Sequence, residues 1–311
     1  LAQSQRSKIY SEMTLVKISS ENSTSIINGN APLAIAALNV GYNTYLGADY
    51  AEIIQYNYTV TEVQRIIINN YLSAKYNITL GSNNFYDEDD VSSGNFDFDV
   101  AGIGQATDGS SHSDAKGLGI IRINSPSSLA NDDYLFWGRN NRTDYSFSTN
   151  TNNYKERISS NWRVSKRNDL GTVTFQVDMT GIDLSNKQSC APLQLVVDND
   201  SDLLSPTSTY SLVNISGNIY EATGVSFSDG DYFTIEYIDT IVLDNTQFYN
   251  GSGTGNRPNN SDECYKLLVK NTATGLLLLT ENSKVREIEV EAGGKFVVDS
   301  EIGLEVSNEI I

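Results

Sequence analysis

Positive charge is scarce in this chain of 311 residues. It has 21 Lys and Arg against 39 Asp and Glu, and its formal net charge is −18. Proteins bind nucleic acids and anionic membrane surfaces through clustered Lys and Arg, and the sequence contains no such cluster. The longest apolar stretches, 31–38 and 275–279, fall far short of the ~18 residues that a membrane-spanning helix needs. We therefore expect no nucleic-acid partner and no direct insertion into a membrane.

Histidine is almost absent. The single histidine, His112, lies in the polar segment 109–114, whereas a Ser-His-Asp or Cys-His catalytic centre needs a histidine that a third group orients. One histidine and two distant cysteines also fail to supply the ligands of a zinc site. We expect this chain not to be an enzyme.

The two cysteines, Cys190 and Cys264, leave the redox compartment open. They form a disulfide bond in an oxidising compartment, or they remain two small buried thiols in a reducing one. Both alternatives are compatible with the sequence.

Asparagine and tyrosine are abundant, with 33 and 18 residues. Asparagine favours turns, and tyrosine favours strands with an aromatic core. Together they are typical of an extracellular β protein.

A two-residue apolar period dominates the chain, and Gly, Asn, Asp and Ser interrupt it roughly every 8 to 12 residues. In the central region, 80–238, this pattern predicts an antiparallel β-sandwich. The expected strands are 96–100, 118–123, 134–138, 161–165, 172–177, 193–197 and 232–235.

One segment has helical periodicity instead. Thr61-Glu62-Val63-Gln64 has the form of a capping box, and apolar residues then recur at helical spacing as far as Lys75. Upstream, segments 15–18, 34–38 and 51–56 are expected strands, too few for a closed sandwich. The chain also opens without Met or a signal-like segment. We therefore expect a fragment whose first domain, 1–79, begins before Leu1 and ends in this helix.

The last region, 239–311, contains short expected strands roughly 9 to 10 residues apart, which predicts stacked rungs or a small β-sandwich. These strands are 267–269, 276–279, 286–290, 296–298 and 304–306. The predicted fold class is therefore all-β: jelly-roll or sandwich domains in tandem, one linking helix, and a short-strand domain that is incomplete at its C-terminus.

A run of alternating acids follows the expected strand 193–197. Asp198, Asp200 and Asp202 match the first positions of a calcium loop, Asp-x-Asp/Asn-x-Asp/Asn. An EF-hand would require Gly at Leu203 and Glu at Thr209, so any calcium site here belongs to a different β-loop type. The alternative is a capped polar turn without a metal.

Two further groups of acids stand out. Segment 87–90, with Asp97 and Asp99 nearby, gathers six carboxylates that repel one another unless they are solvated or bridged by a cation such as calcium. Glu287, Glu289 and Glu291 alternate on one strand, a spacing that overlaps the window for a glycosidase carboxylate pair. Apolar residues fill the other face, so the pattern favours the solvated side of a half-buried strand.

Four large aromatic residues are expected to lie in the core rather than to form a ligand platform: Trp137, Trp162, Tyr232 and Tyr237.

Two stretches resemble the end of a LamG or concanavalin-A-like jelly roll. Segment 45–57, containing Ala51-Glu52-Ile53-Ile54-Gln55-Tyr56-Asn57, resembles its last strand, and segments 61–66 and 71–80 resemble the helix that follows. Further motifs are similar to the domain that accompanies such jelly rolls in very large surface proteins of Bacteroidetes. They are Val100–Gly104, Asn131–Gly138, Trp162–Val164, Gly171–Thr174, Leu195–Asp198 and Phe227–Thr234.

The resemblance implies a surface or secreted multidomain protein, because such proteins are typically cargo of the type IX secretion system and include gliding-motility adhesins. The tail from Cys264 to Gly293 looks like the short β repeats near their C-termini. No sorting domain is recognisable, so it lies beyond Ile311 or the protein departs from the pattern.

The expected function is therefore non-catalytic: adhesion, or a stalk presenting other domains, at the bacterial cell surface. The expected partners are a surface glycan or protein and the secretion or anchoring machinery. The alternative is an accessory carbohydrate-binding region of a polysaccharide-degrading enzyme.

Overall fold

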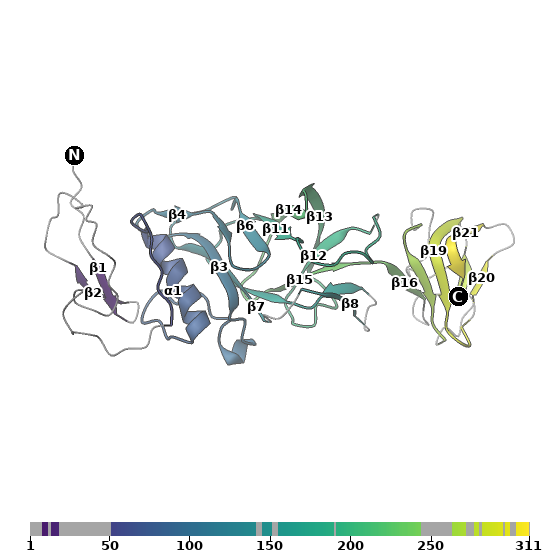
Figure 1. The fold of residues 1–311 in the computed structure, drawn as a ribbon, viewed down its shortest axis with the longest axis horizontal. Coiled ribbons are helices and arrows are strands. Elements are labelled where there is room, and N and C mark those ends of the chain that lie inside the picture. Colours follow the sequence, from purple (N-terminus) through teal and green to yellow (C-terminus); the bar gives the residue numbers. More distant parts are fainter. Residues whose placement is uncertain are drawn as a thin grey trace, which may run out of the picture.

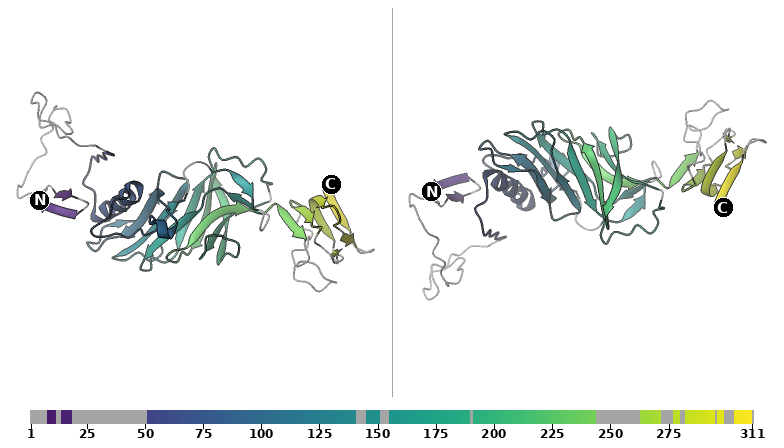
Figure 2. Two further views of the ribbon diagram at one scale, coloured as in Figure 1. Left: turned by 90° about the horizontal axis from the view of Figure 1, so that it is seen from below. Right: turned by 90° about the horizontal axis from the view of Figure 1, so that it is seen from above.

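The computed structural model describes residues 8–11, 14–18, 51–140, 145–150, 155–189, 191–243, 263–271, 277–279, 282–294, 296–298 and 303–310. In these residues the β1–β2 hairpin, one α-helix, a large antiparallel sandwich and a set of short parallel strands follow one another along the long axis (Figures 1 and 2). The predicted all-β class with one helix is confirmed. No helix of the described residues has the length and apolar character needed to cross a membrane.

The strands are β1 (Lys8–Ser11), β2 (Thr14–Ile18), β3 (Phe98–Gln105), β4 (Ser111–His112), β5 (Asp114–Lys116), β6 (Ile121–Asn124), β7 (Asp133–Arg139), β8 (Phe147–Thr149), β9 (Glu156–Ile158), β10 (Trp162–Arg167), β11 (Val173–Asp178), β12 (Leu193–Asp198), β13 (Ser208–Ser216), β14 (Ile219–Val225), β15 (Tyr232–Tyr237), β16 (Thr240–Leu243), β17 (Lys266–Val269), β18 (Leu277–Leu279), β19 (Ser283–Val290), β20 (Phe296–Val298) and β21 (Leu304–Ile310). The helix is α1 (Glu62–Tyr76), and Val91–Ser93 form one 3-10 turn.

Helix α1 begins as the capping box predicts. The Thr61 hydroxyl accepts the Gln64 N–H, and the Gln64 side chain accepts the Thr61 N–H. At the other end, Asn77 adopts the left-handed conformation, and its N–H bonds to the Ser73 carbonyl. The apolar face of the helix packs on β3 and β7 in a core of its own, made by Val63, Ile66, Ala74, Tyr86, Phe96, Val100, Ala106, Tyr134 and Phe136.

Buried Asn70 joins α1 to the following loop. Its amide N–H groups donate to the carbonyls of Ile66 and Asn83, both at 2.9 Å, and its Oδ1 accepts the N–H groups of Phe85 and Tyr86 at 2.8 and 3.0 Å. Asn70 therefore satisfies backbone groups that would otherwise be buried without partners.

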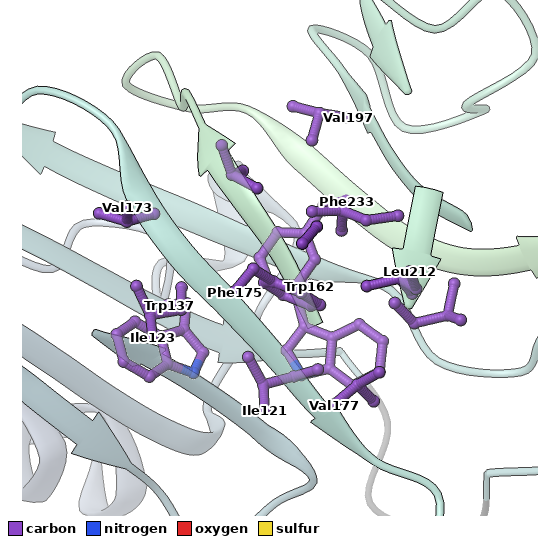
Figure 3. Packing of buried hydrophobic residues seen from close by; sticks show 14 of the residues in the cluster. Ile121, Ile123, Trp137, Trp162, Val173, Phe175, Val177, Val197, Leu212 and Phe233 are labelled. Carbon is purple, nitrogen blue, oxygen red and sulfur yellow. The ribbon is translucent and has the colours of Figure 1, made fainter. Parts of the chain in front are cut away.

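The sandwich is antiparallel throughout, with strand order β4-β3-β7-β10-β15-β12-β13-β14-β11-β6-β5. Strand β13 pairs with β12 through its first half and with β14 through its second half, so it passes from one sheet to the other. The two sheets enclose one core (Figure 3), centred on Phe233, whose ring stacks on Trp162 and meets Phe175 edge-on. Trp137, Trp162 and Tyr237 are buried there, as expected.

The C-terminal strands pair in parallel. Strands β16, β17, β19 and β21 form one sheet, and β18 and β20 form a second. Successive partners within each sheet from β17 onward lie about 20 residues apart, and the chain alternates between the two sheets. This is the stacked-rung arrangement, with Leu267, Val269, Val285 and Ile288 as its buried core.

Of the three strands predicted before the helix, the structure confirms one. Strand β2 covers the expected strand 15–18, whereas 34–38 lies outside the described residues. Segment 51–56 is irregular rather than a strand, and it leaves Ile53 and Ile54 largely exposed. Its apolar composition favours a strand, but a strand also needs a neighbour to accept its backbone hydrogen bonds.

Cys264 is buried and takes part in a disulfide bond. Cys190, its expected partner, lies outside the described residues. The pairing of these two cysteines therefore stays a prediction.

Replacing Asn70 by Ala should lower the free energy of unfolding by about 2–4 kcal/mol, because the buried Tyr86 N–H, the half-buried Phe85 N–H and the Asn83 carbonyl lose their partner. Urea unfolding measures this. Asn69→Ala, at the adjacent and half-buried helix position, is the matched control and should change stability by less than about 1 kcal/mol. Equal losses for the two variants would contradict the role assigned to Asn70.

The disulfide predicts that the denatured chain, treated with an alkylating reagent without reductant, gains no label, and that it gains two labels after reduction. Intact mass measures both. Labelling of both thiols before reduction would exclude a bond between Cys190 and Cys264.

Candidate functional site

Three carboxylates gather at the end of β12, a strand hydrogen-bonded to β13 on one side and β15 on the other. One oxygen from each of Asp198, Asp200 and Asp202 lies within 4.8 Å of the other two. Asp198, the last residue of β12, is 1% exposed, whereas Asp200 and Asp202 are exposed. The structure thus brings together the three residues that the calcium-loop pattern predicts.

The acid loop, residues 198–204, is folded by its own side chains. Asp200 Oδ1 accepts the N–H groups of Asp202 and Leu203 at 3.1 and 3.3 Å, and Asp202 Oδ1 accepts the Leu204 N–H at 2.7 Å. Leu203 has φ 55°, in the left-handed region that glycine favours, and its side chain is fully buried. The leucine that departs from the EF-hand sequence therefore adopts a left-handed turn at this position all the same.

Arg157 of β9 holds the backbone of this loop. Its guanidinium donates to the carbonyls of Asp202 and Leu203, both at 2.7 Å. Glu236 of β15 is fully buried and pairs with both Arg157 and Lys155. The sequence analysis missed Arg157 and Glu236, because no local motif connects them to the acids.

One buried oxygen of the acid loop accepts no hydrogen bond from the described residues. Asp198 Oδ1 accepts the Asn199 N–H at 2.8 Å, but its Oδ2 is buried without any hydrogen bond from the described residues. Nearby Asp231 is also buried, and burial, followed by the negative charge of Asp198, raises the pKa of Asp231. A second buried carboxylate therefore lies near Asp198, and carboxylate oxygens are the ligands that calcium prefers.

The second acidic group, segment 87–90 with Asp97 and Asp99, does not converge. Glu88 pairs with Arg163, and Asp99 pairs with Arg139 at 2.8 Å. Burial raises the pKa of Glu88 to about 7, against the opposing effect of Arg163, and it raises the pKa of Asp89 to about 6. Arginine neutralises two of these six acids, and among the described residues the oxygens of the six do not converge on one point as those of Asp198, Asp200 and Asp202 do.

The glutamates of β19 are paired as well. Lys266 of β17 contacts both Glu287 and Glu289, and Lys270 contacts Glu291. Each carboxylate is thus engaged with a lysine of the neighbouring rung, in agreement with the interpretation as the polar side of a strand.

His112 lies in β4, and burial lowers its pKa. It lines a small apolar pocket of about 140 Å³ together with two exposed tyrosines, Tyr56 and Tyr58, and residues of α1. This pocket was not predicted from the sequence, because segment 51–56 was expected to be a strand.

Tyr232, the fourth aromatic residue expected in the core, is only half-buried. The Arg163 guanidinium lies over its ring, 4.5 Å from the ring centroid.

Residues 64–231, more than half of the chain, match the family model described as a domain of unknown function, DUF8202. The match begins in α1 and ends immediately before β15, so it covers the acid loop and most of the sandwich. No curated protein and no solved structure matches the chain. The chain therefore belongs to the DUF8202 family.

Proposed function

We propose that this chain is a non-catalytic module of a large secreted or surface-anchored bacterial protein, acting in adhesion or as a stalk that presents other domains. The observation that carries the proposal is the junction between the sandwich and the parallel strands. Strand β15 ends at Tyr237 and β16 begins at Thr240, so only two residues separate the last sandwich strand from the first rung. A connection this short favours a stiff, end-to-end arrangement over two domains on a free linker.

One backbone hydrogen bond and the side chain of Arg286 reinforce the same junction. The Asp239 carbonyl accepts the Lys266 N–H at 2.7 Å. Arg286 of β19 donates to the Cys264 carbonyl at 2.8 Å and lies 3.8 Å from the Asp239 carboxylate. Around these contacts the junction is open, with a polar cavity of about 600 Å³ that residues of both parts line. The stiffness of a stalk would therefore depend on β16 and Arg286 rather than on a packed apolar interface.

The charge distribution supports a non-catalytic role. Five of the acids that the sequence singles out pair with Arg or Lys: Glu88, Asp99, Glu287, Glu289 and Glu291. The largest aromatic side chains lie in the core. A net charge of −18 favours a chain that stays dispersed in water. The cell-surface location, export by a type IX system and a Bacteroidetes source rest on the resemblance alone and belong to this proposal.

Arg286→Ala should loosen the junction, because the Asp239 and Cys264 contacts disappear while β16 keeps its backbone pairing. Small-angle X-ray scattering of the whole chain should then show a broader distribution of interatomic distances than for the unchanged chain. Lys284→Ala is the matched control, since Lys284 lies on the same strand but pairs with Glu305. If the two variants scatter alike, Arg286 does not stiffen the junction.

The adhesive role is tested by retention of the purified chain on immobilised polysaccharides and bacterial or host surface proteins, with release of soluble sugar recorded in the same wells. Retention without release is the result expected of an adhesin. A chain that neither binds nor releases sugar would favour the stalk. Sugar release would contradict the proposal, and retention on a polysaccharide alone would favour an accessory region of a polysaccharide-degrading enzyme.

A further inference from the structure

The unpartnered oxygen of Asp198 is the feature from which this inference starts. An ionised carboxylate oxygen that is removed from water needs a hydrogen-bond donor or a cation, because its desolvation is otherwise uncompensated. The fully buried Glu236 has such partners in Lys155 and Arg157, and Glu88 pairs with Arg163. Asp97, which is only half-buried, also has one oxygen without a hydrogen bond from the described residues. Asp198 Oδ2 has none among the described residues.

The unpartnered oxygen belongs to a carboxylate that faces two others. Asp200 and Asp202 each use Oδ1 for the turn, as Asp198 uses its Oδ1 for Asn199. The second oxygen of each carboxylate accepts no hydrogen bond from the described residues. Three like charges with oxygens within 4.8 Å of one another repel, and a cation among them would relieve the repulsion, most of all for the buried Asp198, which water does not reach.

The loop is also preorganised. Arg157 fixes the carbonyls of Asp202 and Leu203, and Glu236 fixes Arg157 from the buried strand β15. Leu203 retains its left-handed backbone although a non-glycine residue is disfavoured there, by about 1–2 kcal/mol. Three acids therefore remain close together on a backbone that the sandwich holds in place.

We propose that Asp198, Asp200 and Asp202 bind a calcium ion at the end of β12, with the unpartnered Asp198 oxygen as the buried ligand. Calcium suits this site better than magnesium, because it accepts irregular sets of six to eight oxygens, whereas magnesium demands a regular octahedron. Three carboxylates with two of them exposed predict a dissociation constant of about 0.1–1 mM, the range of extracellular calcium modules. The inference is independent of whether the chain is adhesive.

Thermal unfolding of the whole chain tests the site. After treatment with EDTA and dialysis, 5 mM calcium chloride should raise the melting temperature by about 3–8 °C over EDTA. Titration calorimetry should give one site in the stated range. Magnesium at 5 mM and sodium chloride at matched ionic strength should give less than a third of the shift. A rise of the same size with sodium chloride would show charge screening, and one with magnesium would show a site without preference for calcium. Either result would overturn the proposal, as would no shift with calcium.

Asp198→Asn sharpens the test. The amide oxygen can still accept the Asn199 N–H, so the turn is kept while the negative ligand is lost. The variant should lose the calcium shift, yet in EDTA it should melt at or above the temperature of the unchanged chain, because an uncompensated buried charge has been removed. A purely structural Asp198 would instead lower the melting temperature equally in calcium and EDTA, which would overturn the proposal.

Two further variants complete the design. Asp202→Asn changes an exposed ligand and should weaken calcium binding at least five-fold even if Asp198→Asn does not fold. Asp183→Asn is the matched control: Asp183 is exposed and accepts the Ser185 N–H two residues on, as Asp200 accepts that of Asp202. It should leave the calcium shift unchanged. A calcium affinity that Asp202→Asn leaves unchanged, or a calcium shift that Asp183→Asn abolishes, would overturn the assignment.

Discussion

Strand β15 is buried on both faces, and the rest of the sandwich depends on it. It is hydrogen-bonded to β10, β12 and β9. One face carries Phe233, Ile235 and Tyr237 into the aromatic core between the sheets, while the other buries Thr234 and Glu236. Polar residues on a buried face require partners. Thr234 accordingly bonds to the Ser160 carbonyl, and Glu236 pairs with Lys155 and Arg157.

The same strand connects features far apart in the sequence. Through Glu236 and Arg157, the buried face of β15 fixes the backbone of the acid loop 198–204. Its C-terminal end continues after two residues into β16, the first of the parallel strands. A substitution at Glu236 would leave the Arg157 guanidinium without its carboxylate, and removal of one partner from a buried pair typically costs about 3–5 kcal/mol. The acid loop and the sandwich core are therefore not energetically independent.

Sequence patterns located the elements whose burial is regular. Strands β11, β12 and β15 alternate or are continuously apolar, and α1 has both a capping box and a helical apolar face. Strands β13 and β14 were missed because β13 passes around the corner between the sheets and the two strands bury only a few residues, among them Leu212 and Ala222. The strand predicted at 51–56 was wrong. The composition of this segment suits a strand, but strand pairing depends on neighbours that composition does not specify.

In the acid loop, too, some features could be predicted from local sequence and others could not. Its three aspartates follow from a local motif, because alternate residues after a strand end return to one side of a turn. Arg157 does not, since it lies 45 residues before the carbonyl of Asp202 and 79 before Glu236. Burial of Asp198 has a non-local cause as well, because β12 is a central strand and β15 and β13 cover its end. An identical motif after an edge strand would leave the first aspartate in water. What distinguishes this loop from an ordinary polar turn is therefore its place in the sheet.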